Sequence, residues 1–198
     1  MTQGMNLAQM RDLVVETVVS PASAAKVVTG FAAARPTLWT ALILIAVLNG
    51  LYYGVLLPSA AAAGLVPVNM ANAPFIVTGA ILLIFTVMVF LLTIMGRFLG
   101  GRGDLDAVMK ITVWLQALRL LAQIIISVLS LAIPFLGSLF ALAVGVWGLW
   151  VLVVFIAAAH QFETVKGFGT LLGTFVATVF ALSILSGILG LGVPSGGL

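Results

Sequence analysis

The chain has no cysteine and only one histidine, and these two scarcities exclude several kinds of chemistry. Without thiols there is no disulfide, no thiolate metal site and no cysteine nucleophile. A single imidazole cannot build a metal site of several histidines. No Ser-His-Asp set, pair of buried carboxylates or nucleotide-binding fingerprint is visible either. The sequence therefore predicts a protein without catalytic residues, metal ligands or a cofactor.

Charge is equally scarce, and this scarcity defines the class of protein. Charged residues make up 7% of the 198 residues, and hydrophobic residues make up 63%. Soluble domains carry about 25% charged residues. A chain this apolar cannot cover its own surface in water, so lipid must be the solvent for much of it. The net charge is only +3, and no dense basic face exists, which argues against nucleic-acid binding.

The long uncharged stretches predict membrane-spanning helices. A helix needs about 20 mostly apolar residues to cross a bilayer. The stretches that meet this requirement are residues 37–57, 75–95, 111–133, 136–159 and 168–191. We therefore predict an all-α membrane protein, in which residues 35–198 form a bundle of five transmembrane helices.

The positions of the cations predict how this bundle is oriented. Those outside the spans lie before the first span, between the second and third, and between the fourth and fifth; they are Arg11, Lys26, Arg35, Arg97, Arg102, Lys110 and Lys166. The other two connections and residues 192–198 carry no charge. Short loops rich in Lys and Arg stay in the cytoplasm. This pattern predicts a cytoplasmic N-terminus and a C-terminus outside.

Residues 1–34 are predicted to form short amphipathic helices before the first span. Apolar residues recur at helical spacing between Leu7 and Val18. Ser20 followed by Pro21 is typical of a helix start, and a second helix is expected to reach Ala34. We expect both helices to lie on the cytoplasmic membrane surface. Packing against the cytoplasmic ends of the bundle is an equally good alternative.

The third span carries an unusual row of polar side chains. They recur at steps of three and four residues, which places them on one helix face; they are Thr112, Gln116, Arg119, Gln123, Ser127 and Ser130. A charged residue in a span costs roughly 2.5–3.5 kcal/mol. If Trp114 marks the interface, Arg119 lies about 7–8 Å below it.

Three interpretations of Arg119 stay open. The favoured one is structural: Arg119 snorkels to the interface or holds helices together. The second is a contact with a partner or a lipid, and the third is a path for a solute or a proton. No acid lies deep in any span, so the candidate partners are Asp104, Asp106 and Glu163.

The connection between the second and third spans is a glycine-rich loop that contains Gly100, Gly101, Arg102 and Asp104. Its backbone amides could cradle an anion, but it lacks the Lys-Ser/Thr ending of a phosphate-binding loop. A tight turn with Asp104 or Asp106 capping the third span is the favoured interpretation.

Two further groups of residues are candidates. His160 and Glu163 could share a proton or bind a metal where the fourth span ends, but a solvated loop is favoured; a membrane enzyme using both is the least favoured function. In the fifth span, small residues recur every four positions: Gly169, Gly173, Ala177 and Ala181. Such a stripe lets helices approach closely, within the bundle, in a homo-oligomer or with a partner helix.

Several motifs together are similar to those of one known family. They are residues 21–25 (PASAA), 35–39 (RPTLW), 99–104 (LGGRGD), 114–116 (WLQ) and 159–162 (AHQF). With them the chain resembles bacterial members of the Yip-type (Ypt-interacting-protein domain) family. The resemblance implies five spans, a cytoplasmic N-terminus and a C-terminus outside. Eukaryotic relatives bind Rab-type GTPases and help to shape or sort trafficking membranes.

The expected function follows from this resemblance and from the absence of a catalytic set. We expect a non-enzymatic scaffold or accessory subunit in a bacterial cytoplasmic (inner) membrane. Its expected partners are membrane lipids and either another integral membrane protein or a second copy of the chain. The alternative is a small-solute or ion transporter that uses the polar face around Arg119.

Overall fold

The computed structural model describes residues 6–188, and all regular structure in that range is helical. The helices in chain order are α1 (Leu7–Val19), α2 (Pro21–Gly30), α3 (Arg35–Ala62), α4 (Val68–Ala71), α5 (Pro74–Phe98), α6 (Leu105–Ala132), α7 (Pro134–His160) and α8 (Thr164–Ile188). Among the described residues, α3, α5, α6, α7 and α8 are long and apolar enough to cross a membrane. The end of the fifth predicted span, residues 189–191, lies outside the described residues.

Two of the spanning helices extend well beyond the predicted spans. The first spanning helix continues through Pro58 to Ala62, whereas the sequence analysis ended it before the proline. The third begins at Leu105 rather than at residue 111, because Asp104 caps it: Asp104 Oδ1 accepts a hydrogen bond from the Ala107 amide at 2.8 Å. Polar residues in the first turns of a helix are easily mistaken for a loop. The capping role that the sequence analysis favoured for Asp104 is confirmed.

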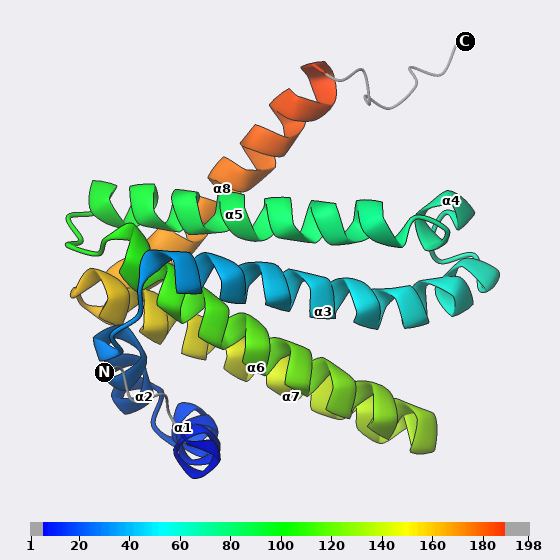
Figure 1. Ribbon diagram of the computed structural model, residues 1–198, viewed down its shortest axis with the longest axis horizontal. Coiled ribbons are helices and arrows are strands. Elements are labelled where there is room, and N and C mark those ends of the chain that lie inside the picture. Colours follow the sequence, from blue (N-terminus) through cyan, green and yellow to red (C-terminus); the bar gives the residue numbers. More distant parts are fainter. Residues whose placement is uncertain (1–5, 189–198) are drawn as a thin grey trace.

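All charged connections lie at the same end of the bundle, which we call the charged end. Arg35 at the start of α3 forms an ion pair with Asp106 at the start of α6, with Nε and Oδ1 2.7 Å apart. The Arg102 amide after α5 donates to the His160 carbonyl at the end of α7. Figure 1 shows α4 and the turn between α6 and α7 at the opposite end. Which side of the membrane each end faces stays a prediction.

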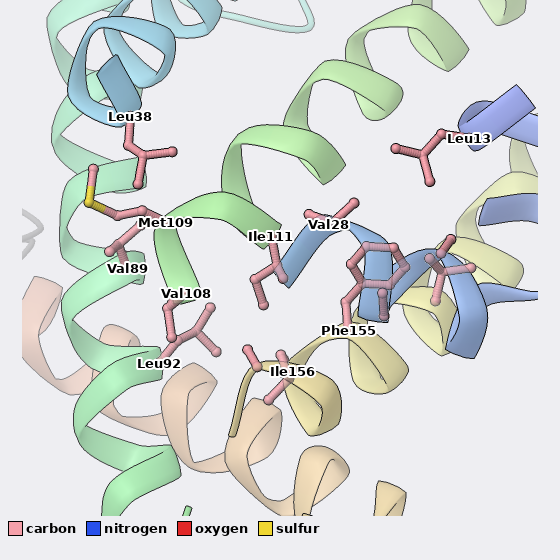
Figure 2. Packing of buried hydrophobic residues seen from close by; sticks show 14 residues of the cluster. Leu13, Val28, Leu38, Val89, Leu92, Val108, Met109, Ile111, Phe155 and Ile156 are labelled. Carbon is pink, nitrogen blue, oxygen red and sulfur yellow. The ribbon is translucent and has the colours of Figure 1, made fainter. Parts of the chain in front are cut away.

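The main buried core sits at the charged end. It draws on α1, α2, α3, α5, α6 and α7, and Figure 2 shows how its side chains converge. Its buried members are Leu13, Ala24, Ala25, Val28, Leu38, Val89, Leu92, Val108, Met109, Ile111, Val151, Phe155, Ile156 and Ala159. A smaller cluster of Leu42, Ile45, Ala46 and Phe85 joins α3 to α5. Burial of these side chains is therefore concentrated in one half of the bundle.

The two short N-terminal helices contribute directly to this core. α2 packs on α6 and α7 and buries Ala24 and Ala25 completely. α1 packs on α2, and Thr17 Oγ1 accepts a hydrogen bond from the Trp114 indole of α6 at 3.1 Å. α2 thus packs against the ends of the spanning helices. The location of α1 at the membrane surface stays a prediction.

Away from the charged end the spanning helices separate. In Figure 1 the pair α3 and α5 diverges from the pair α6 and α7, and α8 leaves the bundle at a steep angle. The side chains there are exposed: Val55 on α3 is 77% exposed and Leu131 on α6 is 87% exposed. Apolar side chains left uncovered in this way are suited to contact with lipid or with another membrane helix.

Candidate functional site

Polar side chains of α3 and α6 meet between the two diverging pairs, and we call this contact the polar seam. It consists of Asn49, Tyr52 and Tyr53 from α3 and Arg119, Gln123 and Ser127 from α6. The hydrogen bonds that join the two helices are Arg119 Nη2 to Asn49 Oδ1 at 3.1 Å, Gln123 Nε2 to Tyr53 OH at 3.1 Å, Tyr52 OH with Ser127 Oγ at 2.7 Å and Tyr52 OH to the Gln123 carbonyl at 3.3 Å. The polar row of the third span thus faces α3.

Arg119 points into the junction of three helices. Its Cζ lies 5.8 Å from the centre of the Phe85 ring on α5, at the distance of a cation–π contact. Asn49, which receives its hydrogen bond, is fully buried and donates its own Nδ2 to the Ile45 carbonyl. Arg119 itself is nevertheless exposed. The contacts of the guanidinium are thus a neutral amide and an aromatic ring, and neither carries a negative charge.

The acidic partners that the sequence suggested for Arg119 were wrong. Asp106 pairs with Arg35, Asp104 caps α6, and Glu163 is exposed. Sequence reasoning missed Asn49, Tyr52, Tyr53 and Phe85. The sequence did contain a sign of this contact. Asn49 is the single side-chain amide in the first predicted span, and the two tyrosines of the chain follow it after three and four residues.

Several polar atoms of the row are buried without a partner. Thr112 Oγ1, Gln116 Oε1 and Gln123 Oε1 are buried without a hydrogen-bond partner in the described part of the chain. Ser130 packs closely against Gly137 of α7 instead of α3. The row therefore makes two contacts, with α3 through Arg119, Gln123 and Ser127 and with α7 through Ser130.

The hydrogen bond between Tyr52 and Ser127 offers a measurable contribution to stability. We expect Tyr52→Phe and Ser127→Ala to destabilise the protein, with a coupling energy of about 0.6 kcal/mol between them, a usual value for interhelical hydrogen bonds in membranes. A double-mutant cycle of unfolding in mixed micelles measures this coupling. A coupling of zero would contradict the bond.

The second candidate site lies at the charged end, where three glycines enclose His160. We call it the glycine cradle; it consists of Gly96, Gly101 and Gly103 around the His160 ring. A Cβ at Gly96 would overlap the imidazole, a Cβ at Gly101 would lie 2.8 Å from Nδ1, and a Cβ at Gly103 would lie 2.6 Å from Nδ1. The Phe162 ring stacks on the imidazole, with centroids 5.4 Å apart. Side chains at these glycines would expel the histidine.

Two helix C-termini build this cradle. α5 and α7 both end in the Schellman pattern of hydrogen bonds: the Gly101 amide donates to the Gly96 carbonyl, and the Phe162 amide donates to the Ala157 carbonyl. Gly100 and Gln161 adopt the left-handed backbone that this pattern requires. The amides of residues 100, 101 and 102 all donate to carbonyls. They are therefore engaged within the protein and not directed at an anion.

The solvated-loop interpretation of His160 was wrong, because the glycines let the loop close over the ring. His160 is 1% exposed, and the backbone of Leu92 on α5 lies beside its imidazole. Glu163 is exposed and makes no hydrogen bond to the ring. Within residues 6–188 no three His, Cys, Asp or Glu side chains gather as a metal site would require.

The small-residue stripe of α8 faces α5 at its start. A Cβ at Gly169 would lie 3.4 Å from Leu99 Cδ1, and one at Gly173 would lie 3.5 Å from Met95 Sδ, which are ordinary contacts. Farther along, Ala177 is half-buried and Ala181 is exposed. The close approach occurs just before the stripe, at Gly167, where a Cβ would lie 2.6 Å from the Val153 carbonyl oxygen of α7.

Five long apolar helices, two of which (α3 and α6) are joined by the polar seam, define an integral multi-pass membrane protein of the α-helical class. A model of the Yip1 domain matches residues 15–185, which is most of the chain. The chain therefore belongs to the Yip1 domain family, a family of generally non-enzymatic membrane proteins. The resemblance to the Yip-type family is confirmed at the level of the family, and the bacterial origin stays a prediction.

Comparisons with curated proteins and with solved structures give no match. The family is thus the level at which this chain is identified.

Proposed function

We propose that this protein is a non-enzymatic scaffold or accessory subunit that binds another integral membrane protein or organises the bilayer around it. The proposed location is a bacterial cytoplasmic membrane, with the charged end in the cytoplasm. The observation that carries the proposal is the uncovered half of α8. Beyond Thr174 its large apolar side chains are exposed, including Phe175, Val179 and Phe180.

The uncovered half of α8 differs from the half that packs on the bundle. Thr170 and Thr174 are buried against neighbouring helices, whereas Phe180 is 67% exposed. Aromatic side chains supply much of the contact area in protein interfaces. In a membrane, helix association depends on such packing, since lipid is as apolar as the helix surface. This supports α8 as the element that contacts a partner.

A photo-crosslinking residue at position 180 tests the proposal in the native membrane. We expect Phe180→benzoylphenylalanine to give one discrete adduct with another membrane protein, recovered in polymer nanodiscs and identified by mass spectrometry. Position 142 on α7 is the matched control, because Leu142 is 66% exposed. We expect adducts there to be mainly with lipid.

The proposal would be overturned by a consistent negative result. Equal, lipid-only crosslinking at both positions, recovery of the chain alone and unchanged vesicle shape on reconstitution would together exclude both partner binding and an effect on the bilayer.

A further inference from the structure

The depth of α1 relative to the spanning helices is determined by its contact with α6. The Thr17 hydroxyl accepts a hydrogen bond from the Trp114 indole at 3.1 Å and donates one to the Leu13 carbonyl at 2.8 Å. Trp114 lies four residues beyond Lys110, the last charged residue before the apolar stretch of α6. Side chains of a helix lean toward its N-terminus, so Thr17 lies at the level where this apolar stretch begins. α1 is therefore held at the boundary of the membrane and not above it in water.

α2 lies nearer to the charged end than α1. Lys110 Nζ donates to the Thr29 carbonyl at the end of α2 at 3.0 Å, and Lys110 precedes Trp114 by about 6 Å along α6. Figure 1 agrees with this order, and it shows α1 nearly end-on while the spanning helices run across the picture. α1 thus runs in the plane of the membrane that the spanning helices cross.

The residues of α1 form stripes with different surroundings. Residues four apart lie on the same face of a helix, and each following pair is turned by about 100°. In order around α1 the pairs are acidic, buried and apolar: Asp12 and Glu16, Leu13 and Thr17, then Val14 and Val18. The acidic stripe and the apolar stripe therefore lie on nearly opposite sides, with the buried stripe between them.

The acidic stripe is turned toward α2 and toward water. Ser23 at the start of α2 donates a hydrogen bond to Glu16, and Asp12 forms an exposed ion pair with Arg11. Because α2 lies on the charged-end side of α1, the apolar stripe is turned the other way, toward the interior of the membrane. The reverse orientation would push two carboxylates into the apolar layer, which is costly.

The apolar side chains that the bundle leaves uncovered on α1 lie at the level of the acyl chains. Leu7, Val18 and Val19 are 86%, 55% and 77% exposed. A helix is about 10–12 Å wide with its side chains, so with its axis at the boundary it reaches about 5 Å into the apolar layer. Helices of this kind bury their apolar side between headgroups and acyl chains. Phospholipid of the surrounding leaflet is therefore the partner that fits this face.

The charge of α1 indicates which interaction holds it in the leaflet. Membrane-surface helices that depend on anionic lipids are rich in Lys and Arg on their polar face. α1 carries one cation and two acids instead, Arg11, Asp12 and Glu16. Anionic headgroups would thus not attract it, and its affinity for the leaflet must come from apolar contact.

We propose that α1 is embedded in the plane of one leaflet at the charged end, with Val14 and Val18 among the acyl chains, and that this contact requires no anionic lipid. The inference rests on the proposed function and adds to it the surface through which the protein organises the bilayer. A helix embedded in this way adds area to one leaflet and none to the other.

Spin labels measure the depth of α1 directly. The chain has no cysteine, so a single label can be placed at Val18→Cys and, as the matched control, at Asp12→Cys. Both native side chains are exposed, so the labels leave the buried stripe intact. The full-length protein is reconstituted in phosphatidylcholine vesicles, and collisions with oxygen and with a water-soluble nickel chelate give the depth of each label. We expect position 18 to lie about 5–10 Å below the headgroup boundary and position 12 to lie in water.

A second set of vesicles tests the role of headgroup charge. We expect the depth at position 18 to be the same when phosphatidylglycerol replaces part of the phosphatidylcholine. Circular dichroism and thermal unfolding verify that both labelled variants are folded.

Three results would overturn the inference: both labels in water, both labels at the same depth, or a buried label at position 18 only when phosphatidylglycerol is present. If position 18 lies in water while position 180 still gives its crosslinked adduct, the proposed function stands and this inference fails. If position 18 is buried but crosslinking is lipid-only, the chain is recovered alone and vesicle shape is unchanged, α1 has its proposed place and the proposed function fails.

Discussion

Gly96→Ala is expected to destabilise the protein by about 1–3 kcal/mol, the usual range for overpacking a closely packed site. The new methyl group would overlap the His160 ring, which is buried and has no free space to enter. His160→Ala alone should also destabilise the protein, because it leaves a cavity at the charged end. The double variant removes the overlap. We therefore expect it to be more stable than the sum of the single effects predicts, as measured by unfolding in mixed micelles.

His160→Ala should compensate for Gly103→Ala less well than for Gly96→Ala. Its methyl group would meet the Ala159 carbonyl oxygen at 2.7 Å as well as the His160 ring. His160→Ala removes the ring but not the carbonyl, so rescue should be smaller than at Gly96. Gly145→Ala is the control, since no atom lies within 4 Å of the added Cβ; it should be neutral or stabilising by up to about 1 kcal/mol. Identical effects at all three glycines would contradict the cradle.

Gly167→Ala is the second substitution with a large expected effect, again about 1–3 kcal/mol of destabilisation. The added Cβ would lie 2.6 Å from the Val153 carbonyl oxygen and 3.2 Å from Ala157 Cβ. Backbone atoms cannot rotate away as a side chain does, so α8 would have to shift from α7. Thermal unfolding in detergent measures the loss.

Gly173→Ala is the matched control on the same helix. Its Cβ would meet Met95 Sδ at 3.5 Å, an ordinary contact with a flexible side chain. We expect little change, or a small gain from the better helix propensity of alanine. If Gly173→Ala were the more damaging of the two, the repeating stripe and not Gly167 would hold α8 in place.

The number of spanning helices could be predicted from the sequence because lipid imposes one strong rule, a long run without charge. The residues at which the helices begin and end were harder to predict. Asp104 starts α6 earlier than the apolar run does, and α3 accommodates Pro58 near its end. At the start of α6 the Asp104 cap, not hydropathy, determines the boundary.

The site was harder to predict because its contacts join distant parts of the chain. The spacing on α6 showed that Arg119, Gln123 and Ser127 share a face, but it could not show that Asn49 and two tyrosines lie opposite. His160 was misread for the same reason. Its burial depends on glycines that are remote in sequence, and a single histidine at the end of an apolar run resembles a solvated one.

Because the main buried core lies only at the charged end, the rest of the bundle depends on the surrounding lipid for its contacts. Contacts between side chains fix the helices at the charged end, whereas the large apolar side chains at the other end are left exposed to the surrounding bilayer. We therefore expect the separation of the two helix pairs there to depend on the length and unsaturation of the acyl chains. A change of lipid composition would thus act on the uncovered end of the bundle and leave the packed charged end unchanged.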